Sequence, residues 1–148
     1  MKSSKTRFDL IDVNLRTLWQ SVRRMYNEEA IKYGVTYGIG FTLLSIDPKK
    51  GTSSTSIGPI MGLEANSLSR LLKTMEINKL VYRKPNPHDG RGVIIFLTKK
   101  GLKKRGITKN KVIKFNKLIK DNITKKDFTI FLNTNNAIKN LISENTMF

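Results

Sequence analysis

Residues 54–97 constrain the fold more than any other part of the chain, because helical and strand periodicity follow one another there in a fixed order. The hydroxyl residues at 52–56 favour the start of a short helix over residues 54–61, and Gly62 favours a turn. A second helix is predicted over residues 65–78, with these apolar residues on its inner face: Leu68, Leu71, Leu72 and Met75. Two short helices joined by a glycine-containing turn are typical of a helix-turn-helix.

Two strand-like runs follow, at residues 80–83 and 93–97, and both are rich in β-branched and aromatic residues. Residues 84–92 between them are dense in turn formers and place Asp89-Gly90 near the expected tip. We therefore expect a hairpin with a long basic loop beside the second helix. Such a wing next to a helix-turn-helix fits a protein that grips two adjacent grooves of a duplex.

Helical patterns precede this segment. From Phe8 to about Tyr33, apolar residues recur at steps of three and four, which predicts a long amphipathic helix, and Gly34 marks its end. Thr36 is expected to cap a shorter helix that stops before Pro48.

Helical patterns also follow it. Thr98 is expected to cap a long lysine-rich helix, and Thr124 and Asp127 form a capping-box variant that opens a last helix. The terminal helices carry more apolar surface than one compact winged lobe needs, so dimerisation through them is the simplest solution. We expect one domain over residues 1–148, with a DNA-binding lobe at 36–97 and dimerisation helices at 8–33 and 98–146. The fold class is mainly α with a small β-hairpin wing.

The charge is large and uneven. The formal net charge is +17, and residues 63–126 alone hold 18 lysines and arginines against four acids. Each lysine run taken singly is well explained as a solvated helix face. An excess this concentrated favours a binding surface for a polyanion such as nucleic acid.

The composition argues against several other classes of protein. The chain has no cysteine and one histidine, so disulfides, thiolate nucleophiles and zinc–cysteine sites are excluded, and we expect no cofactor and no metal. We also expect no enzyme, since no Ser-His-Asp set, phosphate loop or paired carboxylates stand out. The longest uncharged stretch, residues 33–46, is too short to cross a bilayer, and charged residues interrupt the N-terminus. The expected location is the cytoplasm, in association with the nucleoid.

In this element order the sequence resembles the MarR (multiple antibiotic resistance regulator) family of winged helix-turn-helix transcription factors. The resemblance runs from about Leu10 to Leu141 and is sharpest at residues 69–101. It rests on the Asp-x-Arg of the wing at 89–91, the apolar strand after it, and Leu-Thr-x-x-Gly at 97–101. The family implies a dimer with interleaved terminal helices that binds a pseudo-palindromic operator, usually as a repressor relieved by a small ligand.

The resemblance also implies roles for single residues. On the second helix, Asn66, Ser67, Ser69 and Arg70 would contact bases and phosphates in the major groove, with Lys73 beside them. In the wing, Arg91 would enter the minor groove with its guanidinium oriented by Asp89, and Arg83 and Lys84 would add cations near the DNA. The alternatives are an exposed helix charge for Arg70 and a weak surface ion pair for Asp89 and Arg91.

Two features depart from the family pattern. Asn78 stands where members often have glycine, so Asn78 is expected to take the left-handed turn, and Glu64 would repel phosphate unless it caps or pairs locally.

A small aromatic or anionic effector could bind among aromatic walls with one cation. The candidate residues, which ordinary helix packing explains equally well, are Trp19, Arg23, Tyr26, Tyr33 and Tyr37.

The sequence thus predicts a homodimeric, sequence-specific regulator of transcription that binds double-stranded DNA, most simply a repressor. The alternative is a nonspecific or architectural nucleic-acid-binding protein. Resistance to competitor DNA separates the two, since both would neutralise phosphates.

Overall fold

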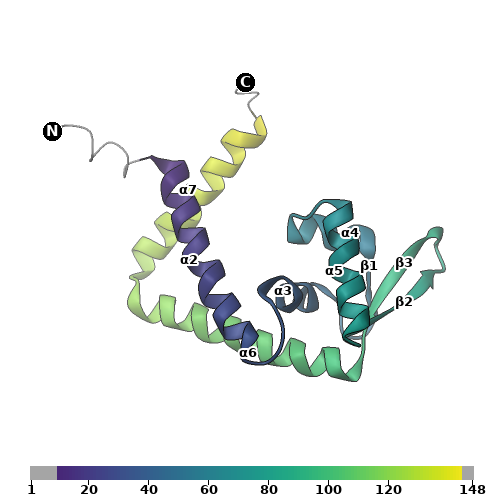
Figure 1. Ribbon diagram of the computed structural model, residues 1–148. Helices are drawn as coiled ribbons and strands as arrows, with labels where there is room; N and C mark the ends of the chain where they lie inside the picture. Colours follow the sequence, from purple (N-terminus) through teal and green to yellow (C-terminus); the bar gives the residue numbers. More distant parts are fainter. Residues whose placement is uncertain (1–9, 145–148) are drawn as a thin grey trace. The chain divides into compact units, whose positions relative to one another are not determined.

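The computed structural model describes residues 10–144, which hold six helices and three short strands (Figure 1). The chain divides between Lys109 and Asn110, within one long helix, into two compact units. The elements in chain order are α2 (Ile11–Ile31), α3 (Tyr37–Ser45), β1 (Thr52–Ser53), α4 (Ser54–Met61), α5 (Ala65–Ile77), β2 (Val81–Asn86), β3 (Asp89–Leu97), α6 (Lys99–Asn122) and α7 (Lys125–Glu144). The predicted mainly α fold with a small wing is confirmed. Residues 8–9 and 145–146 of the expected dimerisation helices lie outside the described residues.

Helix α2 ends, and α3 begins and ends, where the sequence predicts, but α2 begins only at Ile11, after Leu10 in an extended conformation. After α2, Gly34 takes a left-handed conformation with φ +76°, and the N–H of Val35 reaches back to the carbonyl of Ala30 at 3.2 Å. This glycine-terminated pattern satisfies carbonyl groups that the helix end leaves without partners. Thr36 then caps α3, its hydroxyl accepting a hydrogen bond from the Ile39 N–H at 3.3 Å.

Helices α4 and α5 form the predicted helix-turn-helix. Gly62 turns the chain between them with φ +62°, and α5 buries Leu68, Leu72 and Met75. These side chains join residues of α3, α4 and the sheet in one apolar core, in which Leu43 and Ile57 are fully buried. The core therefore fixes which side of α5 faces outward.

The expectation that Asn78 takes the left-handed turn is wrong. The Asn78 N–H still bonds to the Thr74 carbonyl at 3.0 Å, so this residue remains in the helical pattern with φ −77°. The reversal comes one residue later, at Lys79 with φ +57°, and the Leu80 N–H then bonds to the Met75 carbonyl at 2.9 Å. Burial of Leu80 sets this position, because its side chain belongs to the core.

The sheet is larger than the sequence predicts. Its strands are antiparallel in the order β1-β3-β2, and β1, which was not foreseen, pairs Thr52 with Ile95. Most of the expected long loop is strand, and the hairpin turns at residues 87–88, with Asp89-Gly90 directly after the turn and so near the tip as expected. Pro85 fits because β2 is an edge strand, where one side of the backbone needs no hydrogen-bond partner.

The sheet and α6 join tightly. Thr98 donates its hydroxyl to the Lys79 carbonyl at 2.7 Å and accepts the Gly101 N–H at 3.0 Å, so it caps α6 as predicted. One side chain thereby connects the end of α5, the base of the wing and the start of α6. This junction holds the wing beside α5.

The second unit, described over residues 110–144, contains the end of α6 and all of α7. The predicted capping box is present, since the Asp127 N–H donates to the Thr124 hydroxyl at 3.1 Å and that hydroxyl donates to the Asp127 carboxylate at 2.7 Å. Helix α7 has no buried residue and exposes several large apolar side chains, among them Ile130, Phe131 and Leu132. No helix among the described residues is long and apolar enough to span a membrane.

Candidate nucleic-acid interface

The outer face of α5 is polar and open. The exposed residues are Asn66, Ser67, Ser69, Arg70 and Lys73. Within residues 10–144, no hydrogen bond or ion pair engages the side chain of Arg70 or Lys73. The core side of the helix is held by Leu68, Leu72 and Met75, so these polar groups are presented on a rigid element.

The start of α5 is acidic. Glu64 is the N-cap residue, but its side chain makes no capping hydrogen bond, and it has no ion-pair partner among the described residues. The local compensation considered from the sequence is therefore not formed. An exposed carboxylate here disfavours a close phosphate and can instead accept a hydrogen bond from the amino group of cytosine.

The N-terminus of α4 carries the hydroxyl cluster that the sequence suggested as a cap. Ser53, the N-cap residue, makes no capping bond to the backbone, so this expectation is wrong. Its hydroxyl instead lies 2.7 Å from that of Ser56 and 3.3 Å from that of Thr55, because Ser53 also belongs to strand β1. A cleft of about 370 Å³ between α4 and α5 lies beside this cluster and is lined in part by Thr55, Ser69 and Arg83.

Arg83 lies at the base of the wing and is engaged by α5. Its Nε donates to the Glu76 carboxylate at 2.9 Å, and both side chains are about one-third exposed, 36% and 32%. A partly exposed pair of this kind contributes little stability. Its consequence is positional, because it ties strand β2 to the helix whose outer face is open.

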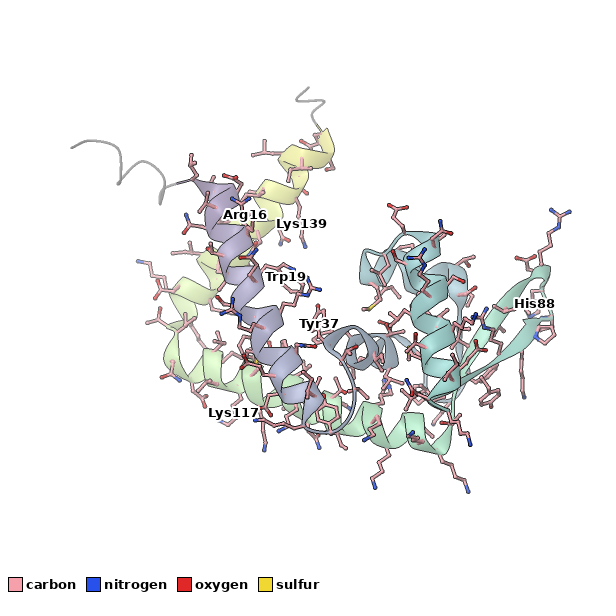
Figure 2. All side chains as sticks on the ribbon, in the orientation of Figure 1. Arg16, Trp19, Tyr37, His88, Lys117 and Lys139 are labelled. Carbon is pink, nitrogen blue, oxygen red and sulfur yellow. The ribbon has the colours of Figure 1, made fainter. Side chains whose placement is uncertain are left out.

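The wing tip holds Asp89 and Arg91 in a compact turn. The Asp89 carboxylate accepts the backbone N–H of Arg91 at 3.1 Å, and among the described residues no ion pair joins it to the Arg91 guanidinium. The Arg91 side chain is exposed, and His88 stands at the end of the hairpin (Figure 2). The carboxylate therefore shapes the backbone of the tip and leaves the guanidinium open.

Lys84 points to the face of the sheet. Its ammonium lies 5.7 Å from the Tyr82 ring centre and 5.3 Å from that of Phe96, and the two rings stack at 5.5 Å. This aromatic pair was not foreseen as a feature of the wing surface. The cross-strand register, Tyr82 opposite Phe96, would have revealed it once the strands were aligned.

The open face of α5 and the wing tip lie in the same unit. In Figure 1, β2 leaves the C-terminal end of α5 and runs back, so the tip points the same way as the N-terminal end of the helix. We call these residues the reading surface: Asn66, Ser67, Ser69, Arg70, Lys73 and Arg91.

A separate cavity of about 1000 Å³ opens between α2, α3 and the turn after α4. Of the five candidate effector residues, Trp19, Arg23 and Tyr37 line it, together with Asn27 and Ser67. The polar contribution of Asn27 was missed, although it follows Trp19 and Arg23 at steps of four on one helix face. Figure 2 shows Trp19 and Tyr37 on facing sides of α2 and α3, with ring centres 5.9 Å apart.

The other two candidates do not line this cavity. Tyr26 is buried against Phe41, with ring centres 5.1 Å apart, and the Tyr33 hydroxyl lies 3.2 Å from that of Thr108. Burial raises the pKa of Tyr26 and Tyr37, so both phenols stay protonated at neutral pH. The cavity thus offers aromatic walls, hydroxyl donors and guanidinium cations.

Comparisons with known proteins agree with this architecture. No protein-family model matches the sequence, and no curated protein matches it. The chain is similar to the crystal structure of a MarR family transcription regulator, at 18% identity and a TM-score of 0.78, over 87% of this chain and 85% of that one. The fold is that of the MarR regulators, as the sequence resemblance implied.

Two further structures are similar. One is the MepR–DNA complex of S. aureus, with 18% identity and a TM-score of 0.78 over 89% of this chain and 98% of that one. The other is PcaV from Streptomyces coelicolor with its natural ligand, with 15% identity and a TM-score of 0.74 over 89% and 93% of the two chains.

Proposed function

We propose that this chain, which has the fold of the MarR-family regulators, is a sequence-specific transcriptional regulator that binds double-stranded DNA as a homodimer. The observation that carries the proposal is the reading surface, where a rigid helix presents unpaired polar and cationic side chains beside a wing with an open arginine. A protein of the same fold has been solved in complex with DNA, which supports this assignment.

In the proposed complex, α5 enters the major groove and the wing tip enters the adjacent minor groove. The Asn66 amide offers a donor and an acceptor and the Arg70 guanidinium offers paired donors, which suit base edges, and the hydroxyls of Ser67 and Ser69 suit phosphate or base contacts. Arg91 supplies a weakly hydrated cation, which suits a narrow minor groove. Lys73 and Lys84 add phosphate contacts, which would contribute equally to the affinity for every DNA sequence.

We propose a homodimer because the terminal helices leave apolar surface uncovered. In α2, Leu15, Leu18 and Trp19 are 42%, 54% and 52% exposed, and α7 buries none of its residues. Amphipathic helices with this much exposed apolar surface are usually covered by another chain. A two-fold dimer presents two copies of α5 and therefore matches a pseudo-palindromic operator. A dimer bound across a promoter would act as a repressor.

The function is tested by fluorescence anisotropy at physiological salt, with DNA from directly upstream of the coding region of this protein. A specific regulator holds labelled DNA at nanomolar concentration against a large excess of scrambled duplex. Binding that collapses under this competition, both here and on fragments selected from the whole genome, would instead assign the chain to nonspecific or architectural binders.

Replacing Arg70 with alanine should weaken operator binding by about 1–3 kcal/mol and relax the preference at one base position, because a bidentate contact to a base edge is lost. Titrations against single-base operator variants measure both effects. Lys73→Ala is the matched control on the same helix, with uniform weakening expected on all sequences. If Arg70→Ala also weakened all sequences equally, Arg70 would contact phosphate only.

We propose further that a small aromatic carboxylate binds in the cavity between α2 and α3 and regulates DNA binding. Arg23 supplies a cation and Trp19 and Tyr37 supply aromatic walls, while Ser67 connects the same cavity to α5. A ligand there touches the helix proposed to read DNA, which gives it a physical route to the operator affinity. A protein of the same fold has been solved in complex with its natural ligand, which supports a small-molecule effector.

Benzoate serves as a probe, because Trp19 is the only tryptophan of the chain and its emission reports on the cavity. Arg23→Gln should weaken benzoate binding about tenfold, since a charge-assisted hydrogen bond is lost. Arg16→Gln, on the same helix but outside the cavity, should bind as the wild type does. Emission that stays unchanged up to millimolar benzoate would contradict the effector site.

A further inference from the structure

A group of lysines lies around the start of α6 and has no part in the reading surface. Lys79, Lys99, Lys100 and Lys103, all exposed, make up this α6 basic patch. The Lys100 ammonium donates to the Asn78 carbonyl at 2.9 Å, and the Thr98 hydroxyl donates to the Lys79 carbonyl at 2.7 Å, so the four residues belong to one junction. No carboxylate pairs with any of them within residues 10–144.

Lys79 occupies a backbone conformation that lysine rarely adopts. Its φ of +57° makes it the sole non-glycine residue with positive φ in the described part of the chain, at a helix-ending position where glycine is usual. The other positive-φ residues of the described chain, at 34, 51 and 62, are all glycine, and those at 34 and 62 also end helices. The left-handed backbone thus carries an exposed lysine at a position that glycine would occupy at lower cost.

Charge at the start of α6 also opposes helix stability. Its first turn contains Lys99 and Lys100 and no acid, although the positive end of the helix dipole disfavours cations there. Lys99 and Lys103 repel each other one turn apart. The Thr98 hydroxyl accepts the N–H of Gly101 at 3.0 Å, and the lysine ammonium groups supply the charge of the patch.

We propose that the α6 basic patch binds the phosphate backbone of a second DNA duplex, so that one molecule can hold two DNA segments. The inference rests on the proposed function in one respect: the first duplex is the one on the reading surface. An external polyanion would relieve the repulsion among these lysines, and the Lys79 ammonium would contact it.

The patch lies beyond the C-terminal end of α5, and four of the five reading-surface residues on this helix lie in its N-terminal half, with Lys73 nearer to the patch. Asn66 is separated from Asn78 by about 18 Å and Arg70 by about 12 Å, at 1.5 Å per residue. The wing also runs away from the start of α6 toward its tip, as Figure 1 shows. A duplex placed along the N-terminal half of α5 and the wing tip is therefore distinct from one that contacts Lys99 and Lys103.

The side chains of the patch favour nucleic acid over other polyanions. Lysine is depleted at protein–protein interfaces, which depend on aromatic and arginine anchors, and residues 99–109 contain no aromatic residue. Leu102 alone exposes a large apolar side chain in this stretch, which is little for insertion into a lipid surface. Flexible point charges without anchors suit sequence-independent phosphate contacts.

The test uses full-length protein with two sets of substitutions, alone and combined. The reading-surface variant is Arg70→Ala with Arg91→Ala, and the patch variant is Lys79→Gln, Lys99→Gln and Lys103→Gln. The control is Lys125→Gln, Lys126→Gln and Lys139→Gln, which removes the same charge from exposed positions of α7. Circular dichroism shows first that all of them are folded.

Each protein is loaded on an immobilised duplex and then offered a labelled duplex of unrelated sequence. The patch variant should capture the labelled duplex at least fivefold less than the control does, and the salt slope for nonspecific duplex should fall by about 3, at 0.9 per phosphate contact. In the reading-surface background, which is not loaded in this way, direct titration with nonspecific duplex should show the same fall in salt slope. Equal capture by the patch variant and the control, together with equal salt slopes in the reading-surface background, would overturn the inference.

This design distinguishes failure of the proposed function from failure of the second DNA site. If the reading-surface variant bound immobilised operator as well as the wild type does, the proposed function would be contradicted, while the loss caused by the patch variant would still support the second site. If the patch variant lost binding to vesicles of anionic phospholipid and retained duplex capture, the patch would be a membrane contact and the inference would be wrong.

Discussion

Replacing Gly101 with alanine is expected to destabilise the protein by about 3 kcal/mol or more. A Cβ at this position would lie 2.0 Å from the carbonyl oxygen of Leu80 and 3.0 Å from its carbonyl carbon. Both are backbone atoms, and the same oxygen accepts the Thr98 N–H at 3.0 Å. Relief therefore requires movement of β2 away from α6, which breaks the junction at Thr98, and overpacking of this kind is among the costliest single changes.

Gly106→Ala is the matched control for this prediction. It lies on the same helix, and a Cβ there meets nothing within 4 Å, so it should stabilise the protein by about 0.5–1 kcal/mol through helix propensity. Urea denaturation of both variants at one protein concentration measures the difference. Equal midpoints would mean that α6 does not pack against Leu80 as closely as described.

The helices could be predicted from the sequence because their ends are chemically marked. Gly34 and Gly62 take the left-handed conformation, and Thr36, Thr98 and Thr124 accept the backbone N–H groups expected of caps. These signals act over three or four residues. A short stretch of sequence is therefore sufficient to predict these helix ends.

The sheet could not be predicted as well, because strand pairing joins distant residues. Thr52 and Ser53 read as capping residues, yet they pair with Ile95 and Ile94 more than forty residues later. The loop of the hairpin was predicted too long for a related reason. Register shifts between Pro85 and Asn86, so Gly90, Arg91 and Gly92 lie in an irregular part of β3 that no local turn motif describes.

The reading surface and the cavity differ in how well they could be predicted from the sequence. Exposure on α5 follows from helical periodicity once its buried face is known, so the sequence was sufficient there. The cavity depends on how α2 packs on α3, which sequence does not encode locally. Tyr26, Tyr33 and Tyr37 have the same residue type, and only their packing determines that Tyr37 lines the cavity and the other two do not.

Replacing Phe131 with glutamate is expected to weaken the proposed homodimer by about 100-fold or more. Phe131 is 50% exposed on α7, a helix that buries none of its residues in the single chain. In a dimer that covers this face, the new carboxylate would be buried without a partner, which costs about 3–5 kcal/mol. Operator binding should fall with it, because two half-sites are no longer engaged by one molecule.

Asn136→Glu introduces the same charge at an exposed polar position of α7, so net charge and helix content are matched between the two variants. Sedimentation velocity over a range of concentrations should give a dimer for this control and a monomer for Phe131→Glu. A Phe131→Glu protein that remained as dimeric as the control would move the interface off this face of α7. The exposed stripe of α2, with Leu15 and Leu18, would then have to supply it, and Leu18→Glu becomes the variant that separates the subunits.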